Sequence, residues 1–193
     1  MRKTTRFPLI SGNLSIDLVN TEVVRRGQRI DLLTTEDEVW DWLQTVQQQL
    51  SFWELKKEEC AEHLFLIKKK LILMRKILRK HFEHTADGLE INSTFLAYLE
   101  ANIELAPLTF KFINQQLVTI PLGKVEEMIA SLIAYDALSL LANGKLSHLK
   151  RCANEDCVLL FMDEHGRRKW CSMKICGNRN KVATYQQRQS DEQ

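Results

Sequence analysis

Four of the five cysteines lie in the last fifth of the chain, where they form two pairs. Cys152 and Cys157 enclose four residues, thirteen residues follow, and Cys171 and Cys176 again enclose four residues. Two chelating pairs at this separation allow two short loops to hold one tetrahedral zinc ion through four thiolates. The spacing therefore predicts a small module whose fold depends on a metal.

Disulfides and buried thiols without a ligand are the alternatives to a metal. Disulfides require an oxidising compartment, and nothing in the sequence indicates one. An iron–sulfur cluster also uses cysteines, but the ligand set and spacing favour zinc. His148 or His165 could replace a thiolate, although four cysteines already complete the tetrahedron. We expect one structural Zn²⁺ ion, and its ligands are Cys152, Cys157, Cys171 and Cys176.

The residues between and after the cysteine pairs predict the rest of this module. Residues 158–162 have the composition of a strand, 163–166 that of a turn, and 167–170 that of a returning strand. The composition after Cys176 is helical, with Ser172 or Asn178 as the capping residue. The order of loop, hairpin, loop and helix predicts a small treble-clef-like zinc module with four cysteine ligands.

This segment resembles a known family. The resemblance depends on three motifs, Cys152-x4-Cys157, Trp170-Cys-Ser-Met173 and Cys176-Gly-Asn-Arg179, which resemble those of the CGNR zinc finger. In that family the finger follows a larger N-terminal domain called ABATE, which residues 14–21 and 39–43 resemble. The family's proteins are described as stress-induced bacterial transcription regulators. The resemblance implies a regulator of transcription that carries a zinc finger.

Positive charge is concentrated near the cysteines. Residues 1–144 hold 17 Lys+Arg and 19 Asp+Glu, whereas residues 145–193 hold 10 and 6. Residues 166–188 contain seven basic residues and no acidic one. Zinc with four thiolates has a formal charge of −2, so neighbouring cations could simply balance the site. The cations in excess of that need favour an anionic partner over an idle solvated surface.

We predict that this partner is nucleic acid, with duplex DNA favoured. If the last helix starts at Ser172, basic and amide side chains recur along one stripe, whereas a start at Asn178 shortens the stripe. Arginine and asparagine can read base edges, and lysine suits phosphate. The basic tip at residues 167–169 would bind the adjacent phosphate backbone of the DNA. The predicted contacts are Arg167, Arg168, Lys169, Lys174, Asn178, Arg179, Lys181 and Arg188.

Residues 1–145 predict a mostly helical α+β domain, and residues 146–193 form the zinc module. The predicted helices are one opened by a Thr35–Glu38 capping box, one over about 54–84, one from Asn92 or Ser93 to about Glu104, and a long apolar one that follows Pro121 and is stopped by Asn143-Gly144. The buried seam of the second of these helices comprises Cys60, Leu64, Ile67, Leu71, Met74 and Leu78, widened by Leu66, Leu73 and Ile77. Two small β-hairpins are predicted, one pairing residues 7–10 with 14–19 and one pairing 108–112 with 117–120.

Asp17, Asn20, Thr21 and Arg25 form a second candidate site near the N-terminus. One interpretation is a small polar site in which a ligand meets a carboxylate and an arginine. The alternative is that Asn20 and Thr21 close a turn while Asp17 pairs with an arginine, and this is favoured because short polar side chains usually satisfy backbone groups. Whichever interpretation holds for these residues, the N-terminal domain is expected to sense a signal, such as a small-molecule effector, or to form a homodimer.

Catalysis and membrane insertion find no support in the sequence. It contains no glycine-rich phosphate loop, no G-x-S-x-G elbow and no H-E-x-x-H helix. Zinc held by four thiolates has no open position for a reacting water. No signal peptide and no long apolar run are present, so we expect a cytoplasmic protein that is not an enzyme.

Three other interpretations stay open. The basic module could bind RNA, because basic zinc modules serve both nucleic acids. It could instead be a protein-interaction adaptor in which the zinc is purely structural and the cations meet an acidic partner. A small-ligand sensor or enzyme within residues 1–144 is the third alternative.

Overall fold

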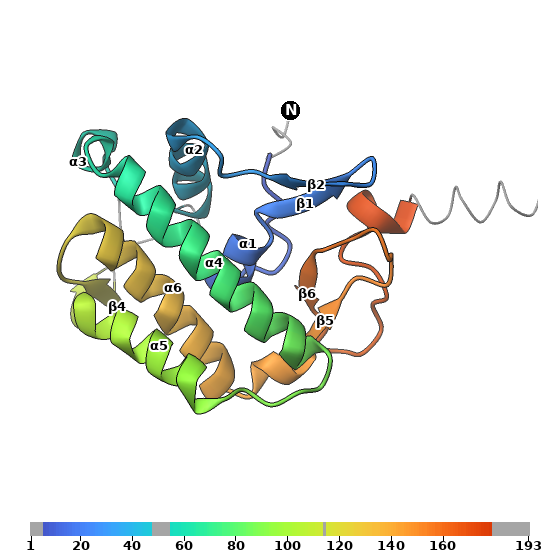
Figure 1. Ribbon diagram of the computed structural model, residues 1–193. Helices are drawn as coiled ribbons and strands as arrows, with labels where there is room; N and C mark the ends of the chain where they lie inside the picture. The colour runs from blue at the N-terminus through green and yellow to red at the C-terminus, as the bar shows by residue number, and fades with distance from the viewer. Residues whose placement is uncertain (1–5, 48–54, 114, 179–193) are drawn as a thin grey trace, which may run out of the picture.

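The computed structural model describes residues 6–47, 55–113 and 115–178. These residues form six α-helices and three two-stranded antiparallel sheets, which makes an α+β fold (Figure 1). The helices are α1 (Leu14–Val19), α2 (Glu36–Gln47), α3 (Lys57–Ala61), α4 (Leu64–Ala86), α5 (Ser93–Leu105) and α6 (Val125–Ala142). The strand pairs are β1 (Glu22–Arg25) with β2 (Gln28–Asp31), β3 (Leu108–Ile113) with β4 (Gln116–Pro121), and β5 (Leu149–Arg151) with β6 (Leu160–Met162).

Helix α4 is the central element, and α1, α2 and α6 pack against it. The predicted seam is confirmed, because all six of its members are buried. Leu66 and Leu73 were expected to widen the seam, but both side chains are about half exposed or more. The single helix predicted over 54–84 is also wrong: α3 and α4 are separated by a turn in which the His63 N–H donates to the Cys60 carbonyl at 2.9 Å. Residue 54 lies outside the described residues.

Helix α2 begins as the sequence predicts. The Glu38 N–H donates to the Thr35 hydroxyl at 3.2 Å, and the Thr35 N–H donates to the Glu38 carboxylate at 3.0 Å, which is a capping box. Trp42 is fully buried and Trp40 nearly so. Both tryptophans therefore belong to the core and are not positioned to stack on a ligand.

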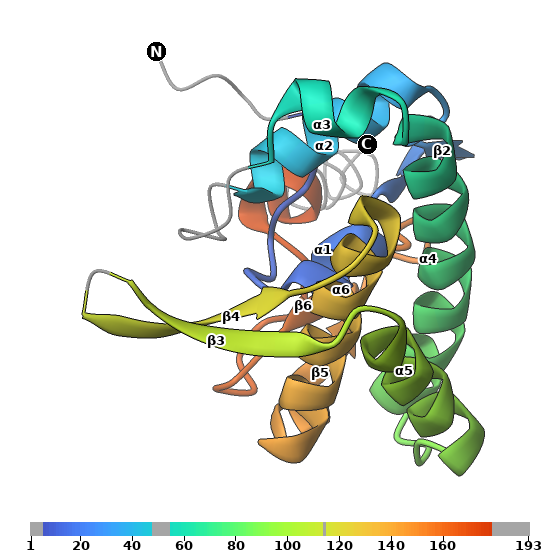
Figure 2. The same cartoon turned by 90° about the vertical axis from the view of Figure 1, so that its left-hand side faces the viewer.

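The second predicted hairpin and the two helices around it are also confirmed. The Asn92 side chain accepts from the Phe95 N–H and caps α5, and α6 ends at Asn143, followed by Gly144 in the left-handed region. Strands β3 and β4 project from the body as an arm (Figure 2). Helix α6 is almost entirely apolar on its buried side, yet no helix in the described parts of the chain is long and apolar enough to cross a bilayer.

The first predicted hairpin is wrong, because residues 14–19 form helix α1 and residues 7–10 form no strand. All six side chains of α1 are buried, so its alternation of apolar and polar residues does not separate core from solvent. The polar side chains have partners inside the protein instead. Ser15 donates to Asp136 of α6 through both its N–H and its hydroxyl, and Asp17 accepts from the hydroxyl of Ser11 at 2.7 Å.

The actual first hairpin consists of β1 and β2, joined by Arg26 and Gly27. Both turn residues have positive φ, 52° and 74°, as a two-residue turn of type I′ requires. Gly27 adopts this backbone without strain, whereas arginine is uncommon there. The missing Asn-Gly or Asp-Gly signature explains why the sequence did not predict this turn.

The zinc module shares one hydrophobic core with the helices. Leu160 and Phe161 of β6 belong to the same buried cluster as α1, α4 and α6. The buried side chain of Asn20 crosses this junction, because its amide donates to the Leu160 carbonyl and its carbonyl accepts from the Leu160 N–H, both at 2.9 Å. The Asn20 amide therefore makes with Leu160 the pair of hydrogen bonds that the backbone of a neighbouring strand would make.

We expect Asn20→Ala to lower the free energy of unfolding by about 2–4 kcal/mol, because it leaves a buried N–H and a buried C=O of Leu160 without partners. Urea denaturation measures the change. The matched control is Asn143→Ala, which removes one exposed hydrogen bond to the Ser139 carbonyl and should cost well under half as much. Equal losses for the two variants would contradict the assigned role of Asn20.

Candidate metal centre and basic surface

The four C-terminal cysteines come together although they belong to separate segments. Cys152 directly follows β5, Cys157 lies in the loop before β6, and Cys171 and Cys176 bracket the start of a helical turn at Met173–Gly177. Their four sulfur atoms all lie within 4.8 Å of one another. Zinc–sulfur bonds of about 2.3 Å in a tetrahedron place the sulfurs about 3.8 Å apart. The arrangement thus fits a single zinc ion with four thiolate ligands.

Backbone and amide groups already point at these sulfurs. The Cys171 N–H donates to Cys152 Sγ at 3.4 Å, and the Asn154 amide donates to Cys176 Sγ at 3.7 Å. Such donors orient ligating thiolates and stabilise their charge. All five cysteines of the chain are free thiols, and Cys157 Sγ and Cys171 Sγ are 3.9 Å apart, far beyond a disulfide bond.

The crowding of the thiols calls for a cation. A hydrogen bond from Cys171 lowers the pKa of Cys157 to about 5. That same hydrogen bond, burial and the neighbouring thiolate charges raise the pKa of Cys171 far above the ordinary thiol range, and burial raises the pKa of Cys176 to about 12. Cys171 and Cys176 thus need a compensating cation to be thiolates at neutral pH. The donor set therefore fits zinc, held by Cys152, Cys157, Cys171 and Cys176.

The loop between the cysteine pairs differs from the prediction. Residues 167–170 are not a returning strand, and β6 pairs with β5 instead. The buried Asp163 carboxylate explains the difference, because it accepts from the backbone N–H groups of Arg167 and Arg168 and so folds the loop back on itself. The Lys169 carbonyl then accepts from the Ala153 N–H at 2.9 Å. The loop is thus held by contacts other than a strand ladder.

The last helix begins at Ser172, whose hydroxyl accepts from the Ile175 N–H at 3.1 Å. Residues 173–177 form one π-helical turn and Asn178 continues it, with both Lys174 and Asn178 exposed. Three predicted nucleic-acid contacts lie outside the described residues, namely Arg179, Lys181 and Arg188.

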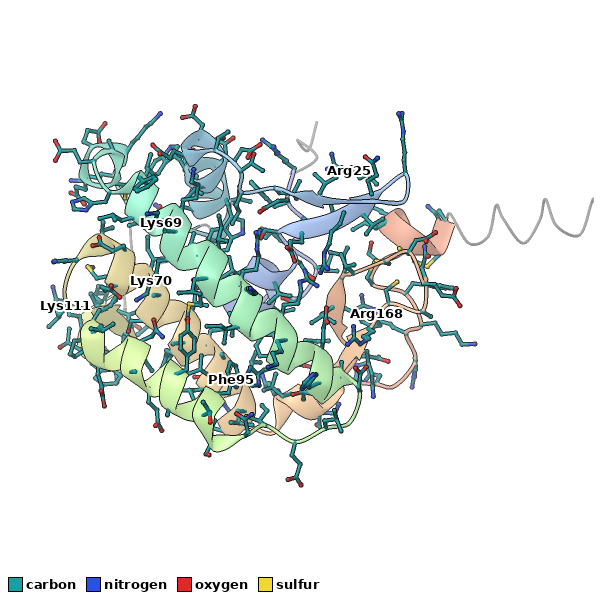
Figure 3. The ribbon with its side chains drawn as sticks, viewed as in Figure 1. Arg25, Lys69, Lys70, Phe95, Lys111 and Arg168 are labelled. Carbon is teal, nitrogen blue, oxygen red and sulfur yellow. The ribbon has the colours of Figure 1, made fainter. Side chains whose placement is uncertain are left out.

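The remaining predicted contacts are not equivalent. Arg167, Lys169 and Lys174 are exposed, and they make no ion pair within the described part of the chain. Arg168 lies over the Phe161 ring at 4.6 Å and donates to the Met162 carbonyl at 3.1 Å and to the Cys171 carbonyl. Arg168, labelled in Figure 3, therefore holds the loop against the core.

The second candidate site is spread over the structure. Asp17 hydrogen-bonds Ser11, and Asn20 binds Leu160 as described above. The buried Thr21 hydroxyl donates to the Leu18 carbonyl at 2.7 Å and accepts from Arg75. Arg25, labelled in Figure 3, is exposed at the end of β1, and within the described residues it makes no hydrogen bond or ion pair with the other three. Asn20 and Thr21 thus form internal contacts.

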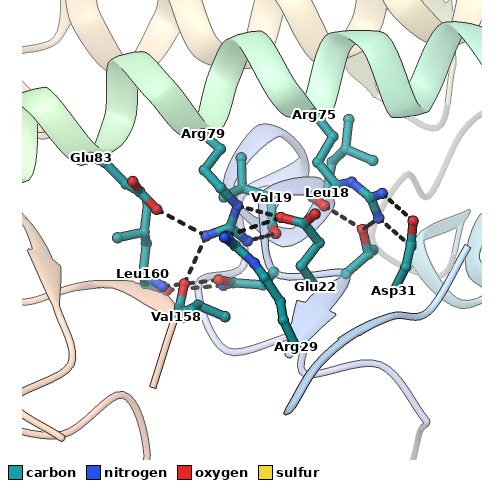
Figure 4. A network of polar contacts seen from close by, with 12 residues as sticks. Leu18, Val19, Glu22, Arg29, Asp31, Arg75, Arg79, Glu83, Val158 and Leu160 are labelled. Carbon is teal, nitrogen blue, oxygen red and sulfur yellow. Dashed lines mark hydrogen bonds and ion pairs between the residues drawn. The ribbon is translucent and has the colours of Figure 1, made fainter. Parts of the chain in front are cut away.

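Two buried arginines of α4, not singled out in the sequence, bind the segments packed beside this helix (Figure 4). Arg75 makes two hydrogen bonds to the Asp31 carboxylate, at 2.6 and 2.5 Å. Arg79 pairs with Glu22 at 2.6 Å and with Glu83 at 3.2 Å. Their sequence signal was two arginines four residues apart beside the apolar seam, which places both on one face of the helix.

Arg79 also binds two backbone carbonyls. Its guanidinium donates to the Val19 carbonyl at the end of α1, at 2.5 Å, and to the Val158 carbonyl between Cys157 and β6, at 2.9 Å. One side chain therefore connects α1, β1, α4 and the zinc module. Burial lowers the pKa of Arg79, and the charges of Glu22 and Glu83 oppose that shift.

Comparison with known families gives two matches. Residues 12–144 match ABATE, described as "Putative stress-induced transcription regulator", and residues 148–189 match the CGNR zinc finger. The first match covers more than half of the chain. No curated protein matches the sequence. Both family resemblances seen in the sequence are confirmed.

We expect the purified protein to contain about one zinc ion per chain, and Cys171→Ser to contain almost none. Because the module shares its core with the helices, loss of zinc should lower Tm of the whole chain by about 10 °C in one transition. Elemental analysis and thermal denaturation measure the two effects. The control is Cys60→Ala, which alters a buried thiol outside the cluster and should retain zinc. Retention of zinc by Cys171→Ser would overturn the ligand assignment.

Proposed function

We propose that this chain, which belongs to the ABATE family and carries a CGNR zinc finger, regulates transcription by binding duplex DNA through that finger. The observation that supports DNA binding is a set of exposed cations on the zinc module without acidic partners in the described residues. These cations are Arg167, Lys169 and Lys174. Unpaired cations on a rigid module are the expected footprint of phosphate binding.

The loop that carries two of these cations is preorganised. Asp163 holds the backbone N–H groups of Arg167 and Arg168, and Arg168 fastens the loop to Phe161. Lys169 is anchored through its carbonyl to Ala153, beside the first cysteine pair. Little conformational entropy is then lost when the exposed side chains meet a phosphate backbone.

The zinc ion is assigned a structural role. Four thiolates fill its tetrahedron, so no position remains for a reacting water. The family description is that of a regulator, which agrees with a binding function in preference to catalysis. The metal would act by holding Cys152, Cys157, Cys171 and Cys176 together so that the basic surface keeps its shape.

For the N-terminal part we propose a domain over residues 1–145 that dimerises, followed by the finger over 146–193. Dimerisation is favoured over small-molecule sensing by the β3–β4 arm, which exposes Phe110, Phe112 and Leu117 by 59 to 75 %. Exposed apolar clusters of this kind mark interaction surfaces. The polar residues considered for a ligand, Asn20 and Thr21, already have internal partners.

We expect Arg167→Ala/Lys169→Ala to bind duplex DNA about tenfold more weakly, at every sequence tested. The slope of log affinity against log salt should fall by about 1.8, since each lost phosphate contact contributes about 0.9. Fluorescence anisotropy with a labelled random-sequence duplex measures both quantities. Arg168 is left in place because it supports the loop.

The control variant is Lys69→Ala/Lys111→Ala, which removes two exposed cations far from the finger (Figure 3) and should leave affinity unchanged. Competition between the duplex and a structured RNA tests which of the two nucleic acids the protein prefers. If the protein prefers RNA, its partner is RNA and not DNA. If it binds neither nucleic acid at low salt, the role of a protein-interaction adaptor is favoured. Selection from a random DNA pool then identifies the site.

A further inference from the structure

A cleft of about 800 Å³ separates the β1–β2 hairpin from the zinc module. Arg25, Arg26 and Gly27 line it from the hairpin, and residues 153–157 and Lys174 line it from the module. Figure 1 shows the hairpin tip and the last helical turn at the same end of the molecule. The cleft also has an apolar part, made by Val23, Leu159, Trp170 and Ile175. It lies beside the zinc ligands and outside the basic loop at 167–169.

Three cations in this cleft have no partner within the residues that the structure describes. They are Arg25, Arg26 and Lys174, all exposed. Arg6 also lines the cleft, but its guanidinium is paired with Glu38. Glu155 and Asp156 are on the module side. The charged residues on the hairpin wall are therefore all cationic, whereas the module wall carries charges of both signs.

The hairpin is held in place more firmly than its size would allow by itself. A two-stranded hairpin with four residues per strand is marginal in water. Here Arg75 holds Asp31 at the end of β2, and Arg79 holds Glu22 at the start of β1. Arg79 also binds the Val158 carbonyl of the module at 2.9 Å. One buried guanidinium thus braces both walls of the cleft.

We propose that this cleft is a second contact for the nucleic-acid backbone, in which phosphates bind Arg25 and Arg26 of the hairpin and Lys174 of the module. The proposal rests on the nucleic-acid binding proposed above and adds a contact from the N-terminal domain. Bracing by Arg79 presets the spacing of the two walls, so binding needs no rearrangement. Glu155 and Asp156 repel phosphate and keep the backbone on the hairpin side.

The test removes the two hairpin charges in Arg25→Ala/Arg26→Gly, where glycine suits the positive φ of residue 26. Affinity for the labelled duplex should fall about tenfold, and the salt slope should fall by about 1.8. Arg25→Lys/Arg26→Lys keeps both charges and should restore most of the affinity. Glu155→Gln/Asp156→Asn removes the repulsion and should strengthen binding severalfold. Tm and zinc content are measured for each variant to verify the fold.

The outcomes separate this inference from the proposed function. If the wild-type protein binds and the hairpin variant binds equally well with the same salt slope, the cleft contact is wrong while binding through the finger stands. If Lys69→Ala/Lys111→Ala weakens binding as much as the hairpin variant, the effect is one of net charge and the cleft contact is again wrong. If the wild-type protein binds neither DNA nor RNA, both proposals fail together.

Discussion

The guanidinium of Arg79 is the interaction on which the relation between the two parts of the chain depends. It is buried, and it binds α1, β1, its own helix and the loop before β6 at once. A buried charge is stable only when its donors have partners, so displacing any of these elements would leave the Arg79 guanidinium buried with an unmatched donor. Asn20 adds a second link between the helices and β6. The zinc module is consequently packed on the helical core and is not joined to it by the chain alone.

The metal centre makes that extension possible. The buried apolar residues of the module, such as Leu160 and Phe161, pack into the helical core, and its loop at 163–170 forms no strand ladder. The pKa values of Cys171 and Cys176 lie above the ordinary thiol range, so a cation is needed to hold these sulfurs as thiolates, and zinc binding then supplies free energy of folding directly. The module exposes the cations of its basic loop and of its helix start, and also the acidic Glu155 and Asp156, while Arg168 makes internal contacts. One short segment thus contains both a cation that stabilises the fold, Arg168, and cations that are free to meet a partner, Arg167 and Lys169.

Regular local patterns in the sequence predicted their elements correctly. The capping box at Thr35 and Glu38, the seam of α4, the cap at Asn92 and the β3–β4 hairpin each depend on contacts between near neighbours. Predictions failed where the environment was not half core and half solvent. Helix α1 is buried on every side, so its buried polar residues produced the alternating pattern that is typical of a strand. The conformation of the loop at 167–170 is set by its hydrogen bonds to the Asp163 carboxylate.

The sequence by itself determined the four cysteine ligands and most of the longer helices, but neither α1 nor the break between α3 and α4. Cysteine spacing and apolar periodicity are local properties of the chain, so they can be recognised before the fold is known. Tertiary structure alone decided which polar residues were free to act. Asn20 and Thr21 were candidates for a ligand site in one of two interpretations, and the structure shows their side chains hydrogen-bonded to Leu160, Leu18 and Arg75. Arg25 and Lys174, far apart in the chain, came to face one cleft. A side chain's hydrogen-bond partners come from distant segments, and only the folded chain brings those segments together.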